Sequence, residues 1–418
     1  MATTKNDVLI LGGGVIGLSC ALVLRKAGVP VRVLEQNRVG SGSSHGNCGT
    51  LTPSHADPLA MPGMIRKALY WMLRRDAPLY VNPRPDFDRL RWLLGFARRC
   101  NWRDFEHAAR ARAAILLDSR RGIERWQATE GIDCDFAADG ALYVYRDAVA
   151  RKADQHHVEL MRRLGIPVQE KTGDEVLAME PALKPGVAAG ILHPGDARLR
   201  PDRYVAGLAR RVRELGGVIE EHCTVDDFLL DSQRVRGVKT GRDEHHAERV
   251  VLALGAWSPL LAKRLELRLP MQPGKGYSIT YSRPSIAPAR PLTLCEDSVC
   301  VTTWPSGFRL GSTMEFSGFD TTLNRTRLDA LRRGAARYLH QPEGGTVEEE
   351  WWGWRPMSVD ELPIIGQSTR WQNLLYATAH GMMGMSMSTT TAELVMAAIC
   401  GSTPPIDPAP YWPGRFKL

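Results

Sequence analysis

The sequence predicts an α/β and α+β protein in which a Rossmann-like domain on a parallel sheet is joined to a second domain built on an antiparallel sheet. Two observations lead to this fold class. Near the amino terminus an apolar strand passes through a glycine-rich turn into a helix, and in the second half short apolar segments typical of strands follow one another. A chain of 418 residues is long enough for two or three domains.

The composition is that of a soluble globular protein. Hydrophobic residues make up 44% of the chain and charged residues 24%, which excludes disordered, collagen-like and disulfide-dense proteins. No stretch reaches about 18 consecutive uncharged apolar residues, so no transmembrane helix is expected. The eight cysteines include no C-x-x-C pair, which argues against a zinc ribbon, an iron–sulfur cluster or a thioredoxin-like site. We therefore expect no metal site and a cytoplasmic location.

The amino-terminal segment contains every part of a dinucleotide-binding unit. Val8–Leu11 is predicted to be a short buried strand, and residues 12–17 read Gly-Gly-Gly-Val-Ile-Gly. A helix over Leu18–Ala27 follows, and a second strand at Val31–Leu34 ends in Glu35. Strand, glycines, helix, strand and acid in this order indicate dinucleotide binding far more specifically than the glycines alone.

Each glycine of this turn has a separate task. Gly12 permits the tight turn, Gly14 lets the backbone approach a pyrophosphate, and Gly17 allows close packing of helix on strand. Glu35 can accept a hydrogen bond from a ribose hydroxyl, which disfavours the 2′-phosphate of NADP. NAD and FAD remain open on these residues. The loop at 40–50, rich in Gly, Ser and Asn, favours FAD because it suits backbone wrapped around phosphate and a flat ring; an ordinary flexible loop is the alternative.

A later segment completes the first domain. Arg249–Ser258 is an apolar strand that ends in glycine, and two shorter strands, Gly217–Glu220 and Val235–Val238, follow a helix over Pro201–Leu215. The nucleotide domain is thus discontinuous, and we assign residues 1–60, 190–270 and 352–418 to it. Residues 61–189 and 271–351 form the second domain, with expected strands at Ala141–Tyr145, Tyr277–Tyr281, Ser298–Thr303 and Phe308–Thr313 and a helix over Leu323–Leu339.

The carboxyl-terminal part supplies two further motifs. Residues 350–356 read Glu-Trp-Trp-Gly-Trp-Arg-Pro, and a strand at Leu374–Thr378 gives way to a Gly- and Met-rich turn, His380–Met387, before a helix over Ser388–Ile399. A strand-to-helix turn of this kind directs backbone N–H groups and a helix dipole at a ligand. A flavin gains from this because its reduction develops negative charge on the ring.

One segment carries all of the excess positive charge. Residues 61–126 contain 15 Lys and Arg against 7 Asp and Glu, a net charge of +8, which equals that of the whole chain. Trp71, Trp92 and Phe96 alternate there with basic pairs such as Arg74–Arg75 and Arg98–Arg99. Solvated Arg-rich helices are one interpretation, and a docking surface for anionic lipid or an acidic partner is the other. Nucleic acid is not expected, because no binding motif accompanies the patch.

With these motifs assembled, the chain resembles the FAD-dependent D-amino-acid oxidase superfamily, which includes glycine and sarcosine oxidases. Within it, the chain is most similar to bacterial D-amino-acid dehydrogenases of the small-subunit type. The run from His45 to His55, His-Gly-Asn-Cys-Gly-Thr-Leu-Thr-Pro-Ser-His, is similar to that of D-hydroxyproline or D-proline dehydrogenases. The motifs extend over nearly the whole chain: Gly12–Gly17 with Glu35, Ser43–Gly49, Ala253–Ser258, Gly274–Ser278, Gly353–Pro356 and His380–Ser386.

The resemblance implies roles for particular residues. The arginine of the G-x-R-P motif, Arg355, would pair with the substrate carboxylate, which a planar guanidinium binds with two parallel hydrogen bonds. Tyr277 would be a second substrate contact, His380 would lie against the flavin, and His55 and Lys275 would also bind substrate. The implied cofactor contacts are Gly12, Gly14, Val15, Ile16, Gly17, Glu35, Gln36, Ser43, Ser44, His45, Asn47, Gly49, Thr50, Val225, Ala253, Gly255, Trp257, Gly381, Met382, Met383, Gly384, Met385 and Ser386.

The implied reaction is oxidative deamination of a D-amino acid by hydride transfer from Cα to flavin N5. FAD is expected to be non-covalent, although Cys48 lies in a flavin loop. Electrons would pass to a quinone or other non-oxygen acceptor, and the basic segment would make peripheral contact with the inner face of the cell membrane. An oxidase that uses O2, and a non-catalytic electron-relay subunit, are the alternatives. An intact Arg355 motif argues against the relay subunit, which has no need of a carboxylate clamp.

Overall fold

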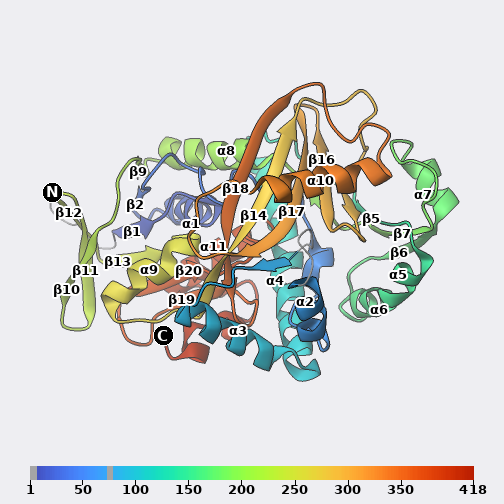
Figure 1. Cartoon of the computed structure of the whole chain (residues 1–418). Helices are drawn as coiled ribbons and strands as arrows, with labels where there is room; N and C mark the ends of the chain where they lie inside the picture. The colour runs from blue at the N-terminus through green and yellow to red at the C-terminus, as the bar shows by residue number, and fades with distance from the viewer. Residues whose placement is uncertain (1–6, 73–78) are drawn as a thin grey trace.

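The computed structural model describes residues 7–72 and 79–418, and within them the predicted parallel sheet is present. Its strands run in the order β19-β20-β13-β1-β2-β9, and all neighbours are parallel except the β19–β20 pair. This sheet lies on the left of Figure 1. The strands are β1 (Val8–Leu11), β2 (Val31–Leu34), β9 (Val218–Glu220), β13 (Arg249–Leu252), β19 (Ile364–Gln367) and β20 (Leu374–Thr378).

Helices cover one face of this sheet and share a single apolar core with it. They are α1 (Val15–Lys26), α4 (Trp102–Thr129), α8 (Pro201–Glu214) and α11 (Ser388–Cys400). A second core on the other face includes residues of a three-stranded sheet, β10 (Asp227–Asp231), β11 (Arg234–Thr240) and β12 (Asp243–His246), and of the short helix α9 (Ser258–Ala262).

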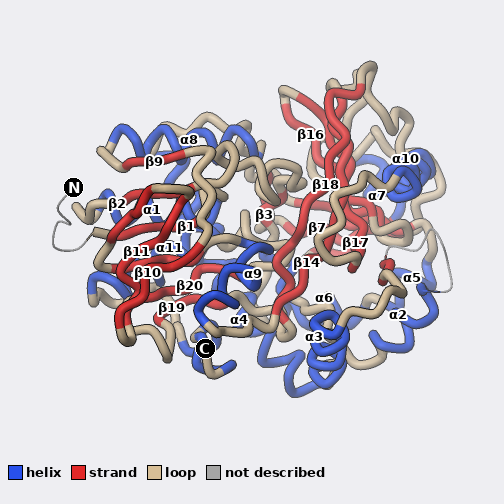
Figure 2. The backbone as a smooth tube through the Cα atoms, turned by 60° about the vertical axis from the view of Figure 1, so that its left-hand side comes forward, coloured by secondary structure: helices blue, strands red, loops and turns tan. Residues whose placement is uncertain are grey.

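The second domain is built on a nine-stranded sheet, seen in the right half of Figure 2. Its strands run β18-β14-β17-β16-β15-β5-β7-β6, with β4 beside β17, and only the β5–β15 and β4–β17 pairs are parallel. They are β4 (Leu79–Val81), β5 (Ala141–Tyr145), β6 (Gln169–Thr172), β7 (Ala189–His193), β14 (Met271–Tyr281), β15 (Leu292–Leu294), β16 (Val299–Trp304), β17 (Gly307–Phe316) and β18 (Val347–Ser358).

The remaining elements surround this sheet. Helix α10 (Arg325–Tyr338) packs on one of its faces and closes a third apolar core with β14, β16 and β17. The others are α2 (Met64–Met72), α3 (Phe87–Arg99), α5 (Ala148–Ala153), α6 (Gln155–Arg163), α7 (Gly173–Met179), the short pair β3 (Thr50–Leu51) and β8 (Ala197–Arg198), and the 3-10 turn η1 (Pro53–Ala56).

The observed helices and strands match the predicted ones closely. The two domains, however, divide the chain at positions that differ from the predicted boundaries. Helix α1 begins at Val15 rather than Leu18, because the glycine turn runs directly into it. Residues 189–193, placed across the boundary, form β7 of the large sheet. Helix α4, expected in the second domain, instead buries Phe105, Ile115 and Leu116 in the core that contains α1 and α11. The described part of the basic segment is mostly helical, in α2, α3 and α4.

Candidate active site

The glycine turn after β1 is as tight as its sequence requires. Gly12 has φ +108°, and a Cβ there would lie 2.5 Å from the Ala253 carbonyl oxygen. A Cβ on Gly17 would lie 2.0 Å from the Gly12 carbonyl oxygen. Only glycine fits at either position, and the close approach holds the first turn of α1 against β1 and β13.

Side chains from the next two segments fix the position of this turn. The Glu35 carboxylate accepts hydrogen bonds from the Gly13 amide at 2.7 Å and the Asn37 amide at 3.0 Å. The Val15 amide donates to Ser44 Oγ at 3.0 Å, and Ser43 Oγ donates to the Trp354 carbonyl of β18. The loop at 40–50 therefore links the nucleotide turn to the strand that carries Arg355.

A cavity of about 1190 Å³ connects the glycine turn with the face of the nine-stranded sheet. Its walls come from both domains, so it can hold a long cofactor and a substrate together. The predicted residues that line it are Gly12, Gly14, Val15, Ile16, Glu35, Gln36, Ser43, Ser44, Asn47, Thr50, His55, Val225, Ala253, Gly255, Trp257, Tyr277, Arg355, His380, Gly381, Met382, Met383, Gly384 and Met385.

Four other predicted cofactor residues support the wall instead of lining it. Gly17 packs against the backbone, and a Cβ on Gly49 would lie 2.0 Å from the Leu199 carbonyl oxygen. Ser386 Oγ donates to the Thr50 carbonyl at 3.1 Å. The ring of His45 faces Glu349 of β18, with 2.9 Å between Nε2 and Oε1. His45 does not line the cavity, and this hydrogen bond fixes its ring at the edge of the loop; its predicted contact with a flavin stays a prediction.

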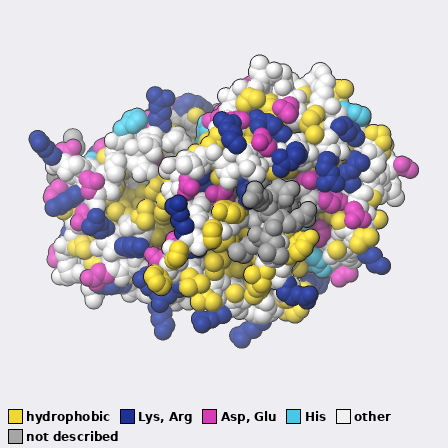
Figure 3. Space-filling model, viewed as in Figure 1, with side chains coloured by type: hydrophobic (Ala, Val, Ile, Leu, Met, Phe, Trp, Pro, Cys, Tyr) yellow, Lys and Arg dark blue, Asp and Glu magenta, His cyan; other side chains and the backbone are white. Residues whose placement is uncertain are grey.

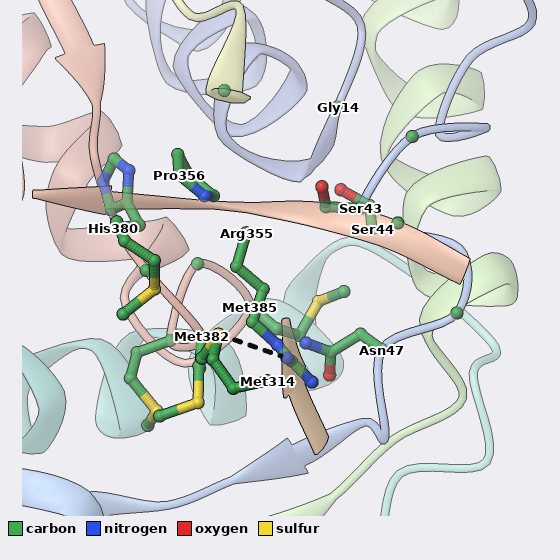
Figure 4. A pocket seen from close by; sticks show the side chains of 18 of the residues that line it. Gly14, Ser43, Ser44, Asn47, Met314, Arg355, Pro356, His380, Met382 and Met385 are labelled. Carbon is green, nitrogen blue, oxygen red and sulfur yellow. Dashed lines mark hydrogen bonds between the residues drawn. The ribbon is translucent and has the colours of Figure 1, made fainter. Parts of the chain in front are cut away.

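Arg355 extends along the cavity face of the large sheet. Its Nη1 donates to the Thr313 carbonyl at 2.6 Å and its Nη2 to the Ser312 carbonyl at 3.5 Å. The side chain crosses β14 at Gly276, where a Cβ would lie 2.3 Å from the guanidinium carbon. Figure 4 shows the guanidinium beside Met314, close to Met382 and Met385. A half-buried guanidinium in this place suits a carboxylate, since the β17 carbonyls leave other N–H groups available.

The electrostatic surroundings of Arg355 include two thiols that the sequence did not connect with it. Burial lowers the pKa of Arg355, while the neighbouring Cys48 and Cys300 thiols act in the opposite direction. A hydrogen bond with Cys300 lowers the pKa of Cys48, and the charges of Arg309 and Arg355 add to this against the effect of burial. The sequence places Cys48 in the expected flavin loop and Cys300 on β16, far away along the chain, so only the fold brings the two thiols together.

Two predicted substrate residues lie on the face of β14 that points away from Arg355. Because strand side chains alternate, Gly276 faces Arg355 whereas Lys275 and Tyr277 point to the opposite side. Lys275 is fully buried there, and its Nζ donates to the Thr322 carbonyl. The Tyr277 hydroxyl donates to Glu315 at 3.1 Å, and its ring belongs to the core beneath α10. Lys275 does not line the cavity, so its predicted substrate role is wrong, whereas Tyr277 lines the cavity and its predicted substrate contact stays a prediction.

His380 lies in the turn that closes the cavity beside Arg355. The Gly381 amide donates to the Pro356 carbonyl at 3.0 Å, which places this turn against β18 (Figure 4). Burial lowers the pKa of His380 to about 3, so its ring is neutral at pH 7. The Thr391 hydroxyl donates to the Met387 carbonyl at 2.8 Å and therefore accepts from His380 Nε2–H at 2.9 Å. This assigns the proton to Nε2 and leaves Nδ1 as an acceptor.

A buried carboxyl, Asp196, lies behind the cavity wall. Ser54 donates to it twice, from its amide at 3.1 Å and from Oγ at 2.5 Å. Burial nonetheless raises the pKa of Asp196 to about 7, because these bonds offset only part of the cost of a charge in this place. Its protonated form therefore stabilises the fold, and that contribution is lost as the pH rises from about 4 to about 7.

The variant Asp196→Asn tests this pH dependence. The amide copies the protonated carboxyl but cannot ionise. The difference in unfolding free energy between the variant and the native protein should therefore grow, in favour of the variant, as the pH rises from 5 to 8. The expected gain is on the order of 3 kcal/mol, since one pKa unit corresponds to about 1.4 kcal/mol. Urea unfolding at both pH values measures the difference. An identical difference at pH 5 and pH 8 would show that Asp196 does not titrate in this range.

The residues present fit FAD. The glycine turn leaves the amino terminus of α1 open to the cavity at Gly14, where a pyrophosphate would lie, and Glu35 lines the same end, where a ribose would lie. At the other end, the Gly- and Met-rich turn at 381–385 and the Arg355 strand enclose room for a ring. The site thus has phosphate, ribose and ring positions in the order that a flavin dinucleotide requires.

Comparisons with known proteins identify the family of this chain. A family model described as FAD dependent oxidoreductase matches residues 7–398. D-amino acid dehydrogenases of Cereibacter sphaeroides and Rhizobium johnstonii are each 32% identical to this chain over 96% of its length, and the matches cover 93% and 97% of those proteins.

Solved structures agree with the fold. Glycine oxidase from Geobacillus kaustophilus has a TM-score of 0.76 at 24% identity, covering 98% of each chain. L-proline dehydrogenase from P. horikoshii has a TM-score of 0.75 at 20% identity, covering 100% of this chain and 99% of its own. On the family match and the similarity to the two dehydrogenases, this chain belongs to the FAD-dependent oxidoreductase family that the sequence motifs predict.

Proposed function

We propose that this protein oxidises D-amino acids, removing a hydride from Cα and yielding an imino acid. The observation that carries the proposal is the position of Arg355, whose guanidinium lies in the same cavity as the dinucleotide turn. A carboxylate clamp beside a flavin site indicates an amino-acid substrate. The two curated relatives named D-amino acid dehydrogenase support the D configuration.

The residues around the cavity account for binding and orientation. Arg355 fixes the substrate carboxylate and with it the direction of the Cα–H bond. The neutral His380 adds no positive charge that would oppose the cationic character that develops on the substrate as the hydride leaves Cα. When bound, FAD supplies the two-electron acceptor for this hydrogen. The glycine turn, Glu35 and the turn at 381–385 provide enough contacts for a dissociable, non-covalent cofactor.

Within D-amino acids, we favour cyclic secondary amines of the D-proline and D-hydroxyproline type. The support is the sequence run from His45 to His55, which also forms part of the cavity wall in the structure. Dye-coupled turnover of D-proline, other D-amino acids and their L-enantiomers tests two proposals: that the substrates are D-amino acids, and that cyclic secondary amines are preferred among them. Turnover of D-alanine with none of D-proline would reject the narrower substrate class, and preference for L-enantiomers would reject the wider one.

We propose that the electron acceptor is a membrane quinone, reached through peripheral binding of the basic segment. Among the described residues, no helix is long and apolar enough to cross a membrane. Apolar side chains nevertheless gather over α2 and α3, with Lys and Arg around them (Figure 3). The exposed members are Ile65, Leu69, Tyr70, Phe87, Leu90 and Leu94, and Arg66, Lys67, Arg91 and Arg98 are exposed beside them. Arg74–Arg75 lie outside the described residues.

The double variant Leu90→Glu/Leu94→Glu tests this surface. Both leucines are more than half exposed, and Leu94 also lines the cavity, so the flavin content of the variant is measured beside its vesicle binding. Binding to vesicles with anionic phospholipid should fall at least about tenfold, because each leucine contributes on the order of 1.5 kcal/mol when buried in the lipid interface. Leu230→Glu on β10, also exposed, is the matched control. Vesicle flotation that gives equal binding for all three proteins would reject the membrane proposal.

A further inference from the structure

The cavity continues past Arg355 to a polar end that the mechanism above does not use. His55, Asp57 and Tyr143 line it there. These side chains come from η1, from the residue that follows it, and from β5, so the wall is formed where the two domains meet. Most of the remaining cavity wall is apolar, and a group of polar side chains at one end therefore indicates where a ligand's polar group is held.

This polar end lies on the same sheet face as Arg355. The guanidinium of Arg355 is bonded to β17 carbonyls, and its charge acts on the Cys300 thiol of the next strand, β16. The sheet then continues through β15 to β5, which carries Tyr143. Three strand spacings from β17 amount to about 14 Å along the sheet. Arg355, His55 and Tyr143 line one continuous cavity, so a single ligand can contact Arg355 and the polar end together.

Buried polar groups behind the wall hold Tyr143 and His55 in place. The Tyr143 hydroxyl lies 3.3 Å from both ring nitrogens of His55 and 3.5 Å from Ser54 Oγ. The Tyr143 ring stacks on His157 of α6, with 5.5 Å between centroids. Arg112 of α4 donates to the His55 carbonyl at 2.7 Å and anchors the backbone of η1. These contacts fix the Tyr143 ring and hydroxyl and the backbone that carries His55.

The charges at this end offset one another. Asp57 lies 3.6 Å from His157 Nδ1, and the two form an ion pair. Burial lowers the pKa of His55 to about 4 and that of His193, which contacts His157 at 3.3 Å, to about 3, so both rings are neutral at pH 7. Beside the Asp57 carboxylate, which is paired with His157, a neutral imidazole and a phenol face the cavity, and each can both donate and accept a hydrogen bond. Such a pair suits an uncharged group that also does both.

We propose that His55 and Tyr143 form a side-chain subsite that binds a hydroxyl group on the substrate. The inference rests on the proposed function and narrows it. The subsite selects hydroxylated amino acids, proline-type secondary amines included, over the same substrates without the hydroxyl. A substrate hydroxyl can add a hydrogen bond to the pair that the Tyr143 hydroxyl and the His55 ring already form, whereas an aliphatic substrate would cover the same polar atoms and add none. This difference is the source of the selectivity.

The test compares kcat/KM for cis-4-hydroxy-D-proline and D-proline in the native holoenzyme and in Tyr143→Phe. We expect the native enzyme to favour the hydroxylated compound, and the variant to lower the ratio of the two kcat/KM values about tenfold. His55→Leu should lower this ratio of kcat/KM values in the same way. It provides a second, independent variant if Tyr143→Phe folds poorly. Tyr145→Phe is the matched control, because Tyr145 follows on the same strand and its hydroxyl bonds Asp154 instead, at 2.9 Å. It should keep the native ratio.

The outcomes separate this inference from the proposed function. An active native enzyme that prefers D-proline, or a ratio that both variants leave unchanged, would overturn the subsite. If neither proline compound is turned over, D-serine and D-alanine form the equivalent pair, and the same comparison decides. A native protein that oxidises no D-amino acid would reject the proposed function itself. Flavin content of each variant, measured after denaturation, shows that a changed ratio does not come from lost cofactor.

Discussion

Replacing Arg355 by alanine should lower kcat/KM for amino acids by a factor of about 100 or more, with FAD still bound. The guanidinium is half-buried on the cavity wall, and removing it leaves a substrate carboxylate without its partner in a largely desolvated cavity, which costs roughly 3 kcal/mol. FAD should remain because the groups assigned to it lie mainly on the glycine turn and the loop at 40–50. Steady-state kinetics and the visible flavin spectrum check the two parts separately.

Arg355→Lys is the informative companion variant. Lysine keeps the positive charge but cannot make two parallel hydrogen bonds to a carboxylate, so it should recover only part of the lost activity. Gly276→Ala should also reduce activity, although it replaces no charged residue. The new Cβ would lie 2.3 Å from the present position of the Arg355 guanidinium carbon and would displace the guanidinium. Near-normal turnover of Arg355→Ala would remove this residue from the substrate site.

Gly17→Ala should abolish FAD binding and destabilise the nucleotide domain. The added Cβ would lie 2.0 Å from the Gly12 carbonyl oxygen, a backbone atom that cannot move without separating α1 from β1. The expected loss of stability is on the order of 3 kcal/mol, as for overpacking in a rigid core. Purified protein should be colourless, and the thermal unfolding midpoint should fall.

Gly195→Ala is the matched control for this prediction. A Cβ at Gly195 would meet only the Pro167 ring, at an ordinary 3.7 Å, and the residue has no positive φ. This variant should keep its flavin and its native thermal midpoint. A yellow, stable Gly17→Ala protein would show that the close approach between α1 and β1 is not needed to bind the cofactor.

The nucleotide domain could be predicted because its signals are local in sequence. The strand at Val8–Leu11, the glycines and Glu35 lie within 28 consecutive residues, and each has one physical role that only a few residue types fulfil. The structure gives β1, β2, β13 and β20 at the predicted positions or nearly so. Helix α4 was assigned to the other domain because nothing in its own sequence says which core its apolar face joins.

The substrate end could be predicted only in part. Arg355 was found because it belongs to a recognisable motif, whereas Lys275 and Tyr277 were chosen without knowing which way β14 faces. A shift of one residue reverses the side of a strand on which a side chain lies, and pairing with β18 decides this. The His55 and Tyr143 group was missed for a related reason: its members are separated by 88 residues and meet only in the folded chain.

An anaerobic spectral titration of the purified holoenzyme tests the central claim most directly. D-proline and other D-amino acids are added in turn, followed by their L-enantiomers and glycine, while the visible flavin bands are recorded. We expect D-amino acids to bleach the flavin, and slow reoxidation when air is admitted, because a quinone is the proposed acceptor. Fast reoxidation with peroxide formation would identify an oxidase instead. A yellow protein that no amino acid bleaches would contradict the proposed activity, and a colourless protein that releases no FAD on denaturation would contradict the assignment of the site.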